Sequence, residues 1–255
     1  MPLSCATRIA AWLKEAERAV VFTGAGISTE SGIPDFRSPG GIWSKYRTVY
    51  YDEFMASADA RREYWRQKSI GHRDFADAQP NAGHRVIAKW QHESRIHGVV
   101  TQNIDGLHQI AGNRNVLELH GTALQVLCQD CGAQYEAEPL VAEFLDTDRV
   151  PACRHCAEGR LKHATISFGQ ALSPGVLEQA VEWCRQADLL FAIGSSLVVS
   201  PAADLPAITK KNGGRLVIIN RDATPLDTIA DDVIHESIGR ALTAIDGCCG
   251  KAPPN

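Results

Sequence analysis

Residues 19–37 read AVVFTGAGISTESGIPDFR, and the fold prediction for the chain starts from this stretch. Its apolar beginning breaks directly into glycines and hydroxyl residues, a pattern typical of a buried parallel strand followed by a phosphate-binding turn and a helix N-terminus. Gly24 and Gly26 have no Cβ atoms to keep a pyrophosphate away from the backbone N–H groups. Ser28 or Thr29 can cap the helix or bond a phosphate oxygen. The stretch therefore predicts a nucleotide site.

The match of this stretch to the dinucleotide-binding fingerprint is incomplete. The third glycine of G-x-G-x-x-G would fall at Thr29, and no acidic ribose ligand follows about 20 residues later. An ordinary dehydrogenase is therefore disfavoured. Taken alone, the Gly-x-Gly pattern is weak, since a plain tight turn would explain it equally well.

The composition sets broad limits on the class of protein. The 255-residue chain is 44% apolar and 22% charged, with a formal net charge of −4. These values suit a globular protein with one large domain, or one domain that carries a smaller insert, and they give no general affinity for nucleic acid or an anionic membrane. No apolar run approaches the roughly 20 residues that span a bilayer, and the first residues given show neither the basic stretch nor the hydrophobic core of a signal peptide. We therefore expect a cytoplasmic protein that binds no membrane.

Short apolar runs recur along the chain, and each ends in small, polar or titratable residues. The runs are 99–101 before Gln102, Asn103, Ile104 and Asp105, 116–119 before His120, 189–193 before Gly194, Ser195 and Ser196, and 216–219 before Asn220. Helical stretches at 175–186 and 202–211 separate the later runs. In an open parallel α/β sheet such strand ends line one crevice, where ligands bind. Polar residues commonly end strands, but solvation alone does not explain Asn103, Asp105 and His120 together.

Two Cys-x-x-Cys pairs predict a metal site. Cys128 and Cys131 form the first pair, and Cys153 and Cys156 form the second. Two such pairs place four thiolates around one tetrahedral Zn²⁺ and leave no open position, so the ion should be structural and should hold a ribbon with too few apolar residues to fold alone. A redox role is the alternative, but it needs a thioredoxin-like context that is absent. We expect His155 to be exposed and not a ligand.

Taken together, these motifs resemble the bacterial-type sirtuins, members of the NAD-dependent protein lysine deacylase family. Residues 62–68, followed by 79–81, are similar to the class II branch, which the N-terminal half of the chain resembles most. The matching segments are 24–28 with 32–37, 101–108, 119–121, the four cysteines, Phe168 with Gly169, 194–197, and Asn220. They occur in the family's order and span about residues 20–240, nearly the whole chain.

The resemblance implies an α/β fold, with a Rossmann-like parallel-sheet domain interrupted by an inserted small domain. The large domain would comprise residues 1–40, 81–123 and 164–255. The small domain would combine a helical module at 41–80 with a zinc-ribbon module at 124–163. NAD, as co-substrate, and an acyl-lysine protein substrate would meet between the two parts.

The resemblance also assigns roles to residues at the matching positions. The NAD-binding set would be Gly24, Ala25, Gly26, Ser28, Phe36, Arg37, Gln102, Asn103, Ile104, Asp105, Gly194, Ser195, Ser196, Asn220 and Ile238. His120, Asn103 and Asp105 would be catalytic, with His120 as the general base. The substrate peptide would add as a strand between two edges formed by Ile166, Phe168, Gly169, Leu197 and Val198.

The chemistry implied by the resemblance is physically reasonable. An amide oxygen is a poor nucleophile, so the nicotinamide bond must be strained and the developing positive charge stabilised in a closed polar pocket. His120, whose pKa is ordinarily near neutral, would take a proton from a ribose hydroxyl. The products would be nicotinamide, free lysine and O-acyl-ADP-ribose, and zinc would take no part.

The substrate side departs from the family pattern. Gln170 replaces a common acidic residue, and His163 replaces a common proline. Sirtuins that remove succinyl or malonyl groups carry a Tyr-x-x-Arg pair, and the alignment places Trp65 and Lys68 at those positions. Indole lacks the hydroxyl and an ammonium lacks the planar fork, so we predict a neutral acyl group.

Two other functions remain open from the sequence. One is protein mono-ADP-ribosyl transfer in the same pocket, and the other is a non-catalytic NAD- or ADP-ribose-binding module, which the presence of His120, Asn103 and Asp105 disfavours. A zinc-ribbon protein that binds specific nucleic acid is disfavoured by the net charge and by the lack of a basic aromatic stripe. We expect a monomer.

Overall fold

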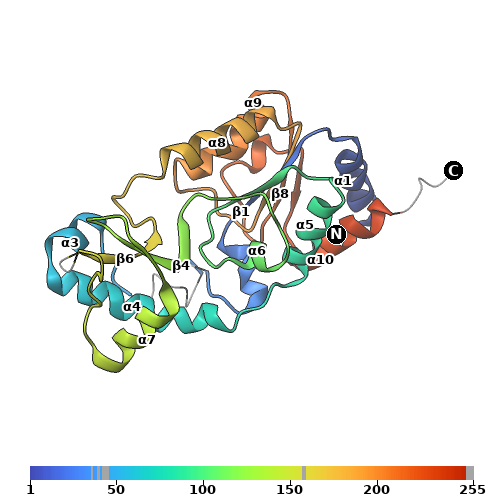
Figure 1. Ribbon diagram of the computed structural model, residues 1–255. Helices are drawn as coiled ribbons and strands as arrows, with labels where there is room; N and C mark the ends of the chain where they lie inside the picture. Colours follow the sequence, from blue (N-terminus) through green and yellow to red (C-terminus); the bar gives the residue numbers. More distant parts are fainter. Residues whose placement is uncertain (36, 39–40, 42–45, 157–158, 251–255) are drawn as a thin grey trace.

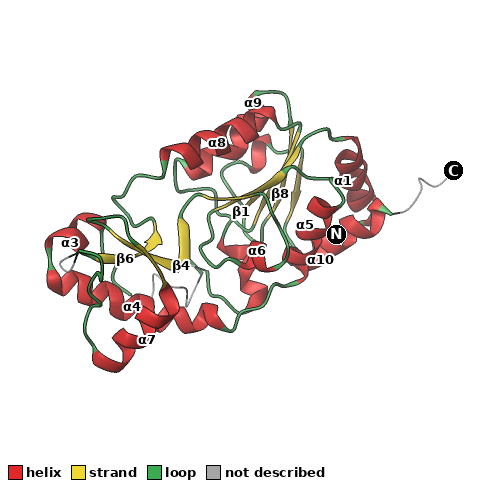
Figure 2. Cartoon of the chain, in the orientation of Figure 1, coloured by secondary structure: helices red, strands yellow, loops and turns green. Residues whose placement is uncertain are grey.

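The computed structural model of the protein describes residues 1–35, 37–38, 41, 46–156 and 159–250. The chain forms a larger lobe around a parallel sheet and a smaller lobe around an antiparallel sheet (Figures 1 and 2). The larger lobe takes up both ends of the described chain, and the smaller lobe is built from two internal segments. The predicted architecture, a Rossmann-like domain with an inserted small domain, is confirmed.

The parallel sheet of the larger lobe has six strands in the order β3-β2-β1-β7-β8-β9. The strands are β1 (Ala19–Thr23), β2 (Gly98–Thr101), β3 (Val116–Glu118), β7 (Leu189–Ile193), β8 (Arg215–Ile219) and β9 (Asp232–Ile234). Central strand β1 pairs with β2 on one side, with Val21 opposite Val99, and with β7 on the other, with Val21 opposite Phe191. The order of the strands reverses between β1 and β7, and such a switch point is where open α/β sheets bind ligands.

Helices cover both faces of the parallel sheet (Figure 2). One face packs on α1 (Leu3–Glu15), α5 (Ala82–His92) and α10 (Ile238–Cys249), and the other on α8 (Pro174–Gln186) and α9 (Leu205–Lys211). Val21 points into the first core, whereas Val20 and Phe22 point into the second. This two-sided burial explains why the strand is continuously apolar. Cys184 lies in the second core, and Cys249 ends α10 in the first.

The smaller lobe joins the helical module and the ribbon in one hydrophobic core. Its elements are α3 (Tyr51–Ala56), α4 (Ala58–Ala76), β4 (Gly121–Cys128), β5 (Gln134–Glu136), α7 (Ala137–Thr147) and β6 (Leu161–Thr165), with strand order β5-β4-β6. Trp65 of α4 packs with Val126 of β4, Phe144 of α7 and Leu161 of β6. The ribbon therefore relies on α4 for its core as well as on its cysteines. The sequence analysis missed α7, whose buried face completes this contact.

The glycine-rich turn differs from the prediction. The expected α-helix after β1 is a 3₁₀ segment of seven residues, Ala25–Ser31, and its N-cap residue Gly24 makes no side-chain cap. The segment ends because Gly32 has a φ of 88°. The hydroxyl of Thr29 bonds the carbonyl of Gly26 at 2.8 Å instead of capping a helix. Other elements that the sequence analysis missed are α6 (Leu107–Ile110) and the C-terminal β9 and α10.

Two strands run side by side where the lobes meet. Gly121, at the start of β4, pairs with Thr165, at the end of β6, and the Ile166 N–H donates to the His120 carbonyl at 2.8 Å. Gly121 has a φ of 69°, and a Cβ there would lie 1.9 Å from the carbonyl oxygen of Ala164. Glycine is therefore required at the crossing. The crossing holds His120 between the two sheets.

Candidate active site

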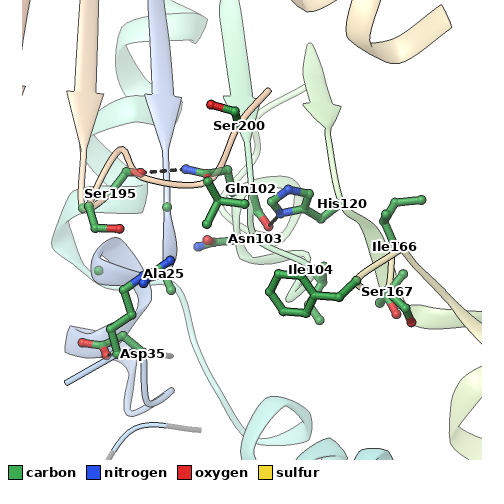
Figure 3. Close-up of a pocket in the computed structure, with 18 of the residues that line it drawn as sticks. Ala25, Asp35, Gln102, Asn103, Ile104, His120, Ile166, Ser167, Ser195 and Ser200 are labelled. Atoms are coloured by element: carbon green, nitrogen blue, oxygen red, sulfur yellow. Dashed lines mark hydrogen bonds between the residues drawn. The ribbon is translucent and has the colours of Figure 1, made fainter. Parts of the chain in front are cut away.

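A cavity of about 1310 Å³ lies between the lobes, at the C-terminal ends of β1, β2, β7 and β8. Most residues that were expected to bind NAD or substrate line it, namely Gly24, Ala25, Gly26, Arg37, Gln102, Asn103, Ile104, His120, Ile166, Phe168, Gly169, Gly194, Ser195, Ser196, Asn220 and Ile238. Figure 3 shows Ser195 and Ala25 at one end and Ile166 and Ser167 at the other, with His120 and Ile104 between them. The predicted convergence of strand ends on one crevice is present.

Some residues expected in the site do not line the cavity. Ser28 and Asp105 are buried behind Asn103, where their side chains bond each other. Leu197 is buried in the core between the sheet and α8, and Val198 is half exposed on the surface, so the neighbouring Val199 lines the cavity instead. Leu197 has a φ of 53°, and this turn of the backbone changes which side chains face inward. Phe36 lies outside the described residues.

The turns after β1 and β7 touch through their backbones. The Gly26 N–H donates to the Gly194 carbonyl at 2.8 Å. A Cβ on Gly26 would lie 2.7 Å from the Gly194 Cα, and one on Gly24 would lie 2.8 Å from the Gly194 carbonyl oxygen. Glycine is therefore required at positions 24 and 26 because the two turns pack this closely, whether or not a nucleotide is bound. Together with Ala25, they leave a cavity wall of backbone and small side chains, which fits a pyrophosphate.

Hydrogen bonds order the polar side chains behind the β2 strand end. Gln102 Nε2 donates to Ser195 Oγ at 2.8 Å, which ties the end of β2 to the turn after β7 (Figure 3). Asn103 Nδ2 donates to Ser28 Oγ at 3.0 Å, and Ser28 Oγ donates to Asp105 Oδ2 at 2.7 Å. Ser28 and Asp105 therefore support Asn103 from behind, a role that their local sequence does not reveal.

The tautomer of His120 follows from one hydrogen bond. Its Nδ1 lies 2.9 Å from the carbonyl oxygen of Gln102 (Figure 3). A carbonyl can only accept, so Nδ1 carries the proton and Nε2 keeps a free lone pair. Burial lowers the pKa of His120, and the weaker opposing effect of the Gln102 carbonyl does not cancel it. His120 is therefore neutral at pH 7 and able to accept a proton.

The α4 helix presents a different face to the cavity from the one predicted. Tyr64, Gln67 and Lys68 line it, whereas Trp65 is fully buried in the small lobe and donates to the Leu161 carbonyl at 2.8 Å. The assignment of Trp65 to the acyl pocket is wrong, because residues at i, i+3 and i+4 share a helix face and residue i+1 does not. Lys68 Nζ lies 5.7 Å from the centre of the Tyr64 ring, and burial lowers the pKa of Lys68.

Several cavity residues were missed by the sequence analysis. Asp35 accepts hydrogen bonds from the backbone N–H groups of Arg37, at 3.0 Å, and Ser38, at 2.7 Å. Burial opposes ionisation of Asp35, but together the hydrogen bonds from Ser38 and Arg37 lower its pKa. Arg221 donates to Ser38 Oγ at 2.8 Å and so joins the end of β8 to this loop. Asp35 precedes Phe36 and Arg221 follows Asn220, and both of these neighbours were predicted to bind NAD. This adjacency is the feature of the sequence that could have identified Asp35 and Arg221 as cavity residues.

The four cysteines of the small lobe form one compact cluster. The sulfur atoms of Cys128, Cys131, Cys153 and Cys156 all lie within 4.8 Å of one another. Two of the separations are 3.7 Å, which suits thiolates about 2.3 Å from a shared tetrahedral zinc and is too long for a disulfide. A Cβ on Gly159 would lie 2.2 Å from Cys128 Sγ. The cluster fits one structural zinc ion with four thiolate ligands, as predicted.

Comparisons with known proteins decide the family. A model of the Sir2 family matches residues 24–201. The NAD-dependent protein deacetylase of Rhodopseudomonas palustris is 46% identical over 90% of this chain and 91% of its own length. NAD-dependent protein deacetylase 1 of Bradyrhizobium diazoefficiens is 47% identical over 92% of both chains. The chain belongs to the Sir2 family.

Solved structures of sirtuins share the whole fold. A Sir2 structure with p53 peptide and NAD⁺ superimposes with a TM-score of 0.87 at 36% identity, covering 96% of this chain and 97% of the other. A Sir2 structure bound to acetylated peptide has a TM-score of 0.86 at 34% identity, covering 98% of this chain and 100% of the other. The similarity to sirtuins that the motifs indicated is confirmed for this chain.

Replacement of a cluster cysteine tests the structural role of zinc in this sirtuin. We expect Cys128→Ser or Cys153→Ser to lose about one zinc per chain and several kcal/mol of unfolding free energy, because the binding energy of a structural zinc is also folding energy. Zinc content by elemental analysis and thermal unfolding are the measurements. Cys5→Ser, outside the cluster, is the control and should keep its zinc. A stable, zinc-free Cys128→Ser protein with lost activity would show a redox or catalytic role instead.

Substitution of Gly26 tests the contact between the two turns. In Gly26→Ala the new Cβ would meet the backbone of Gly194 at 2.7 Å. Because backbone cannot move aside cheaply, we expect a loss of roughly 1–3 kcal/mol of unfolding free energy and NAD binding weakened more than tenfold. Calorimetric titration with NAD and chemical denaturation measure the two effects. Gly175→Ala is the control, since a Cβ there meets nothing within 4 Å. Unchanged NAD affinity in Gly26→Ala would refute the assignment.

Proposed function

We propose that this sirtuin is an NAD-dependent protein lysine deacylase that releases nicotinamide and O-acyl-ADP-ribose. The observation that carries the proposal is the placing of His120. Its free Nε2 belongs to a neutral, half-buried imidazole in the cavity between the strand ends of the large lobe and the β6 end of the small lobe. The relatives at 46% and 47% identity are named as NAD-dependent protein deacetylases, which supports the same activity.

The large lobe supplies the residues that would hold NAD. The backbone wall at Gly24, Ala25 and Gly194 suits the phosphates, and Ser196 and Asn220 extend the cavity toward the ends of β7 and β8. When bound, NAD supplies an electrophilic ribose carbon and nicotinamide as leaving group. Asn103 lines the same cavity, and Ser28 holds its amide nitrogen from behind. The chain itself fixes these polar groups in place before binding, which lowers the cost of ordering the transition state.

His120 is the proposed general base. The Gln102 carbonyl holds its Nδ1–H, and the backbone of His120 is fixed by Ile166, so Nε2 has a defined direction. The base would accept a proton from a ribose hydroxyl and later return it. A pKa below the usual value of about 6.5 keeps the base unprotonated at neutral pH.

An acyl-lysine peptide is the proposed second substrate. Ile166, Phe168 and Gly169 line the cavity on the small-lobe side, and Phe168 is 43% exposed. Val198 faces the surface on the large-lobe side and is 50% exposed. An extended peptide added as a strand between these two edges would gain affinity from main-chain hydrogen bonds, and it would also bury both apolar side chains. The roles of these side chains toward the peptide remain predictions.

None of the helices in the described parts of the chain is long and apolar enough to cross a membrane. The cytoplasmic location and the monomeric state stay predictions. Incubation with NAD and acyl-lysine peptides, with both deacylated peptide and ADP-ribosylated protein read by mass spectrometry, separates deacylation from ADP-ribosyl transfer.

Substitution of His120 tests the proposed reaction. We expect His120→Ala to slow deacylation by on the order of 10²–10⁴ while NAD still binds, because a positioned base acts only during the chemistry. Because burial lowers the pKa of His120, the wild-type rate should hold through neutral pH and fall only at a pH below the ordinary imidazole pKa of about 6.5, as the base gains a proton. Deacylated peptide by mass spectrometry and NAD affinity by calorimetry are the measurements. His155→Ala, at an exposed position, is the control. Full activity in His120→Ala would refute the proposal.

The acyl preference is a further prediction. The Tyr64 hydroxyl, which we did not expect in the cavity, already lies 3.4 Å from Thr165 Oγ1, and Lys68 offers only a point charge that burial disfavours. We therefore still expect acetyl or a longer neutral acyl group to be preferred over succinyl, by roughly 1–3 kcal/mol in kcat/KM.

Acetyl, butyryl and succinyl forms of one peptide test this preference, with Lys68→Met as the matched variant. Lys68→Met should leave acetyl removal nearly unchanged, since a neutral acyl group needs no cation. Succinyl removal faster than acetyl removal in the wild type, and its loss in Lys68→Met, would overturn the prediction and make Lys68 a carboxylate ligand.

A further inference from the structure

A buried histidine that has no part in the proposed reaction is linked to Asn103 of the cavity by hydrogen bonds. His108 is on the short helix α6, is 1% exposed and does not line the cavity. Its Nε2 lies 3.0 Å from Thr23 Oγ1, at the end of β1. We propose that His108 is a positioning residue that holds Asn103 through Thr23 and Thr101, with His84 as its partner. The role toward the nicotinamide rests on the proposed function.

The hydrogen bonds from His108 to Asn103 have a defined direction. The Asn103 N–H donates to Thr101 Oγ1 at 3.0 Å, and Thr23 Oγ1 donates to the same oxygen at 2.8 Å. Thr23 has thus used its only hydroxyl hydrogen and can only accept from the imidazole. His108 must therefore carry its proton on Nε2. This chain of three hydrogen bonds fixes the Asn103 backbone.

A second chain fixes the side chain of the same asparagine. Asn103 Nδ2 bonds Ser28 Oγ, which bonds Asp105 Oδ2, and Asp105 Oδ1 accepts from the Leu107 N–H at 3.0 Å. Leu107 directly precedes His108 in α6. The two chains therefore close into one circuit that holds Asn103 by its backbone and by its amide. A buried network of hydrogen bonds is most rigid when every donor and acceptor in it has a partner.

His84 of α5 supplies the matching group for the remaining nitrogen of His108. The Asn81 N–H donates to His84 Nδ1 at 3.4 Å, so His84 carries its proton on Nε2. Among the described residues, His84 Nε2 and His108 Nδ1 are both buried without a partner. The first is a donor and the second an acceptor, and the rings meet edge to face with centroids 4.9 Å apart. A small ring rotation, or one bridging water, satisfies both atoms.

The surroundings keep both rings neutral. Burial, with a smaller contribution from the neighbouring His84, lowers the pKa of His108 to about 3. Burial also lowers the pKa of His84 to about 4, with Arg85 acting in the same direction and Asp105 and Glu30 opposing it. At neutral pH each ring therefore has one donor and one acceptor nitrogen. This is the state that the two chains of hydrogen bonds require.

The tautomers are tested first in the folded wild-type protein, without any substrate. Long-range ¹H–¹⁵N NMR spectra of the imidazoles should show His84 and His108 as neutral Nε2–H tautomers. A protonated Nδ1 on His108 would overturn the proposal outright. Assignment comes from comparison with His84→Gln and His108→Gln.

The positioning role is tested with His108→Leu and His108→Gln. The glutamine amide can still donate to Thr23, whereas leucine fills similar space and cannot. We expect His108→Leu to speed exchange of the Asn103 amide hydrogen and to raise the Kd for NAD and nicotinamide by roughly three- to thirtyfold, with the KM of the acyl-peptide unchanged. His108→Gln should restore each value to within about threefold. The Gly194 amide, which donates to Ile219 across the sheet, is the internal control for exchange.

Thr101→Val provides a second route to the same result. It removes the shared acceptor oxygen but keeps both histidines, so it should reproduce the effects of His108→Leu, and the double variant should lose less than the sum of the two. Equal loss of thermal stability in His108→Leu and His108→Gln, with Asn103 exchange and NAD affinity unchanged, would overturn the proposal. If the wild type neither binds nor consumes NAD, the proposed function fails, and the tautomer and exchange measurements still decide the circuit.

Discussion

The close backbone contact between the turns after β1 and β7 is the constraint on which the site depends. Gly24, Gly26 and Gly194 meet with no room for a Cβ between them. This contact sets the spacing of the two central strand ends, so it also sets the width of the cavity between them. The side chains that follow β2 are then held against these two turns, and Gln102 bonds directly to the turn after β7. The wall of small residues that we propose binds the phosphates of NAD is a consequence of how closely the two turns pack.

The junction between lobes places the proposed base. His120 follows the edge strand β3, and Gly121 lets the chain cross beside the end of β6. The crossing brings residues of the small lobe to one side of the imidazole and the strand ends of the large lobe to the other. The proposed meeting point of two substrates is thus produced by one pair of adjacent residues. Trp65 supports this arrangement from a distance, because it packs α4 against the strands that carry the crossing.

Low polarity around the buried histidines serves two different purposes. At His120 burial keeps the ring neutral while its Nε2 still faces the cavity, so the ring can accept a proton. At His84 and His108 burial keeps both rings neutral with no access to the cavity, so they can only hold other groups. The same physical effect gives a proposed base in one place and a rigid support in the other. The difference lies in whether a nitrogen lone pair reaches the cavity.

The sequence by itself determined the parallel sheet, the meeting of its strand ends at one crevice and the cysteine cluster that fits zinc, because these follow from local periodicity and short spacings. It also located most of the cavity lining. Only the tertiary structure decided which neighbour in each motif faces the site. Tyr64 rather than Trp65 lines the cavity because the core of the small lobe takes the indole. Ser28 and Asp105 support Asn103 from behind because β1 and β2 are adjacent in space, although 75 residues or more of sequence separate Ser28 from the other two. Such choices depend on long-range packing, which local patterns do not contain.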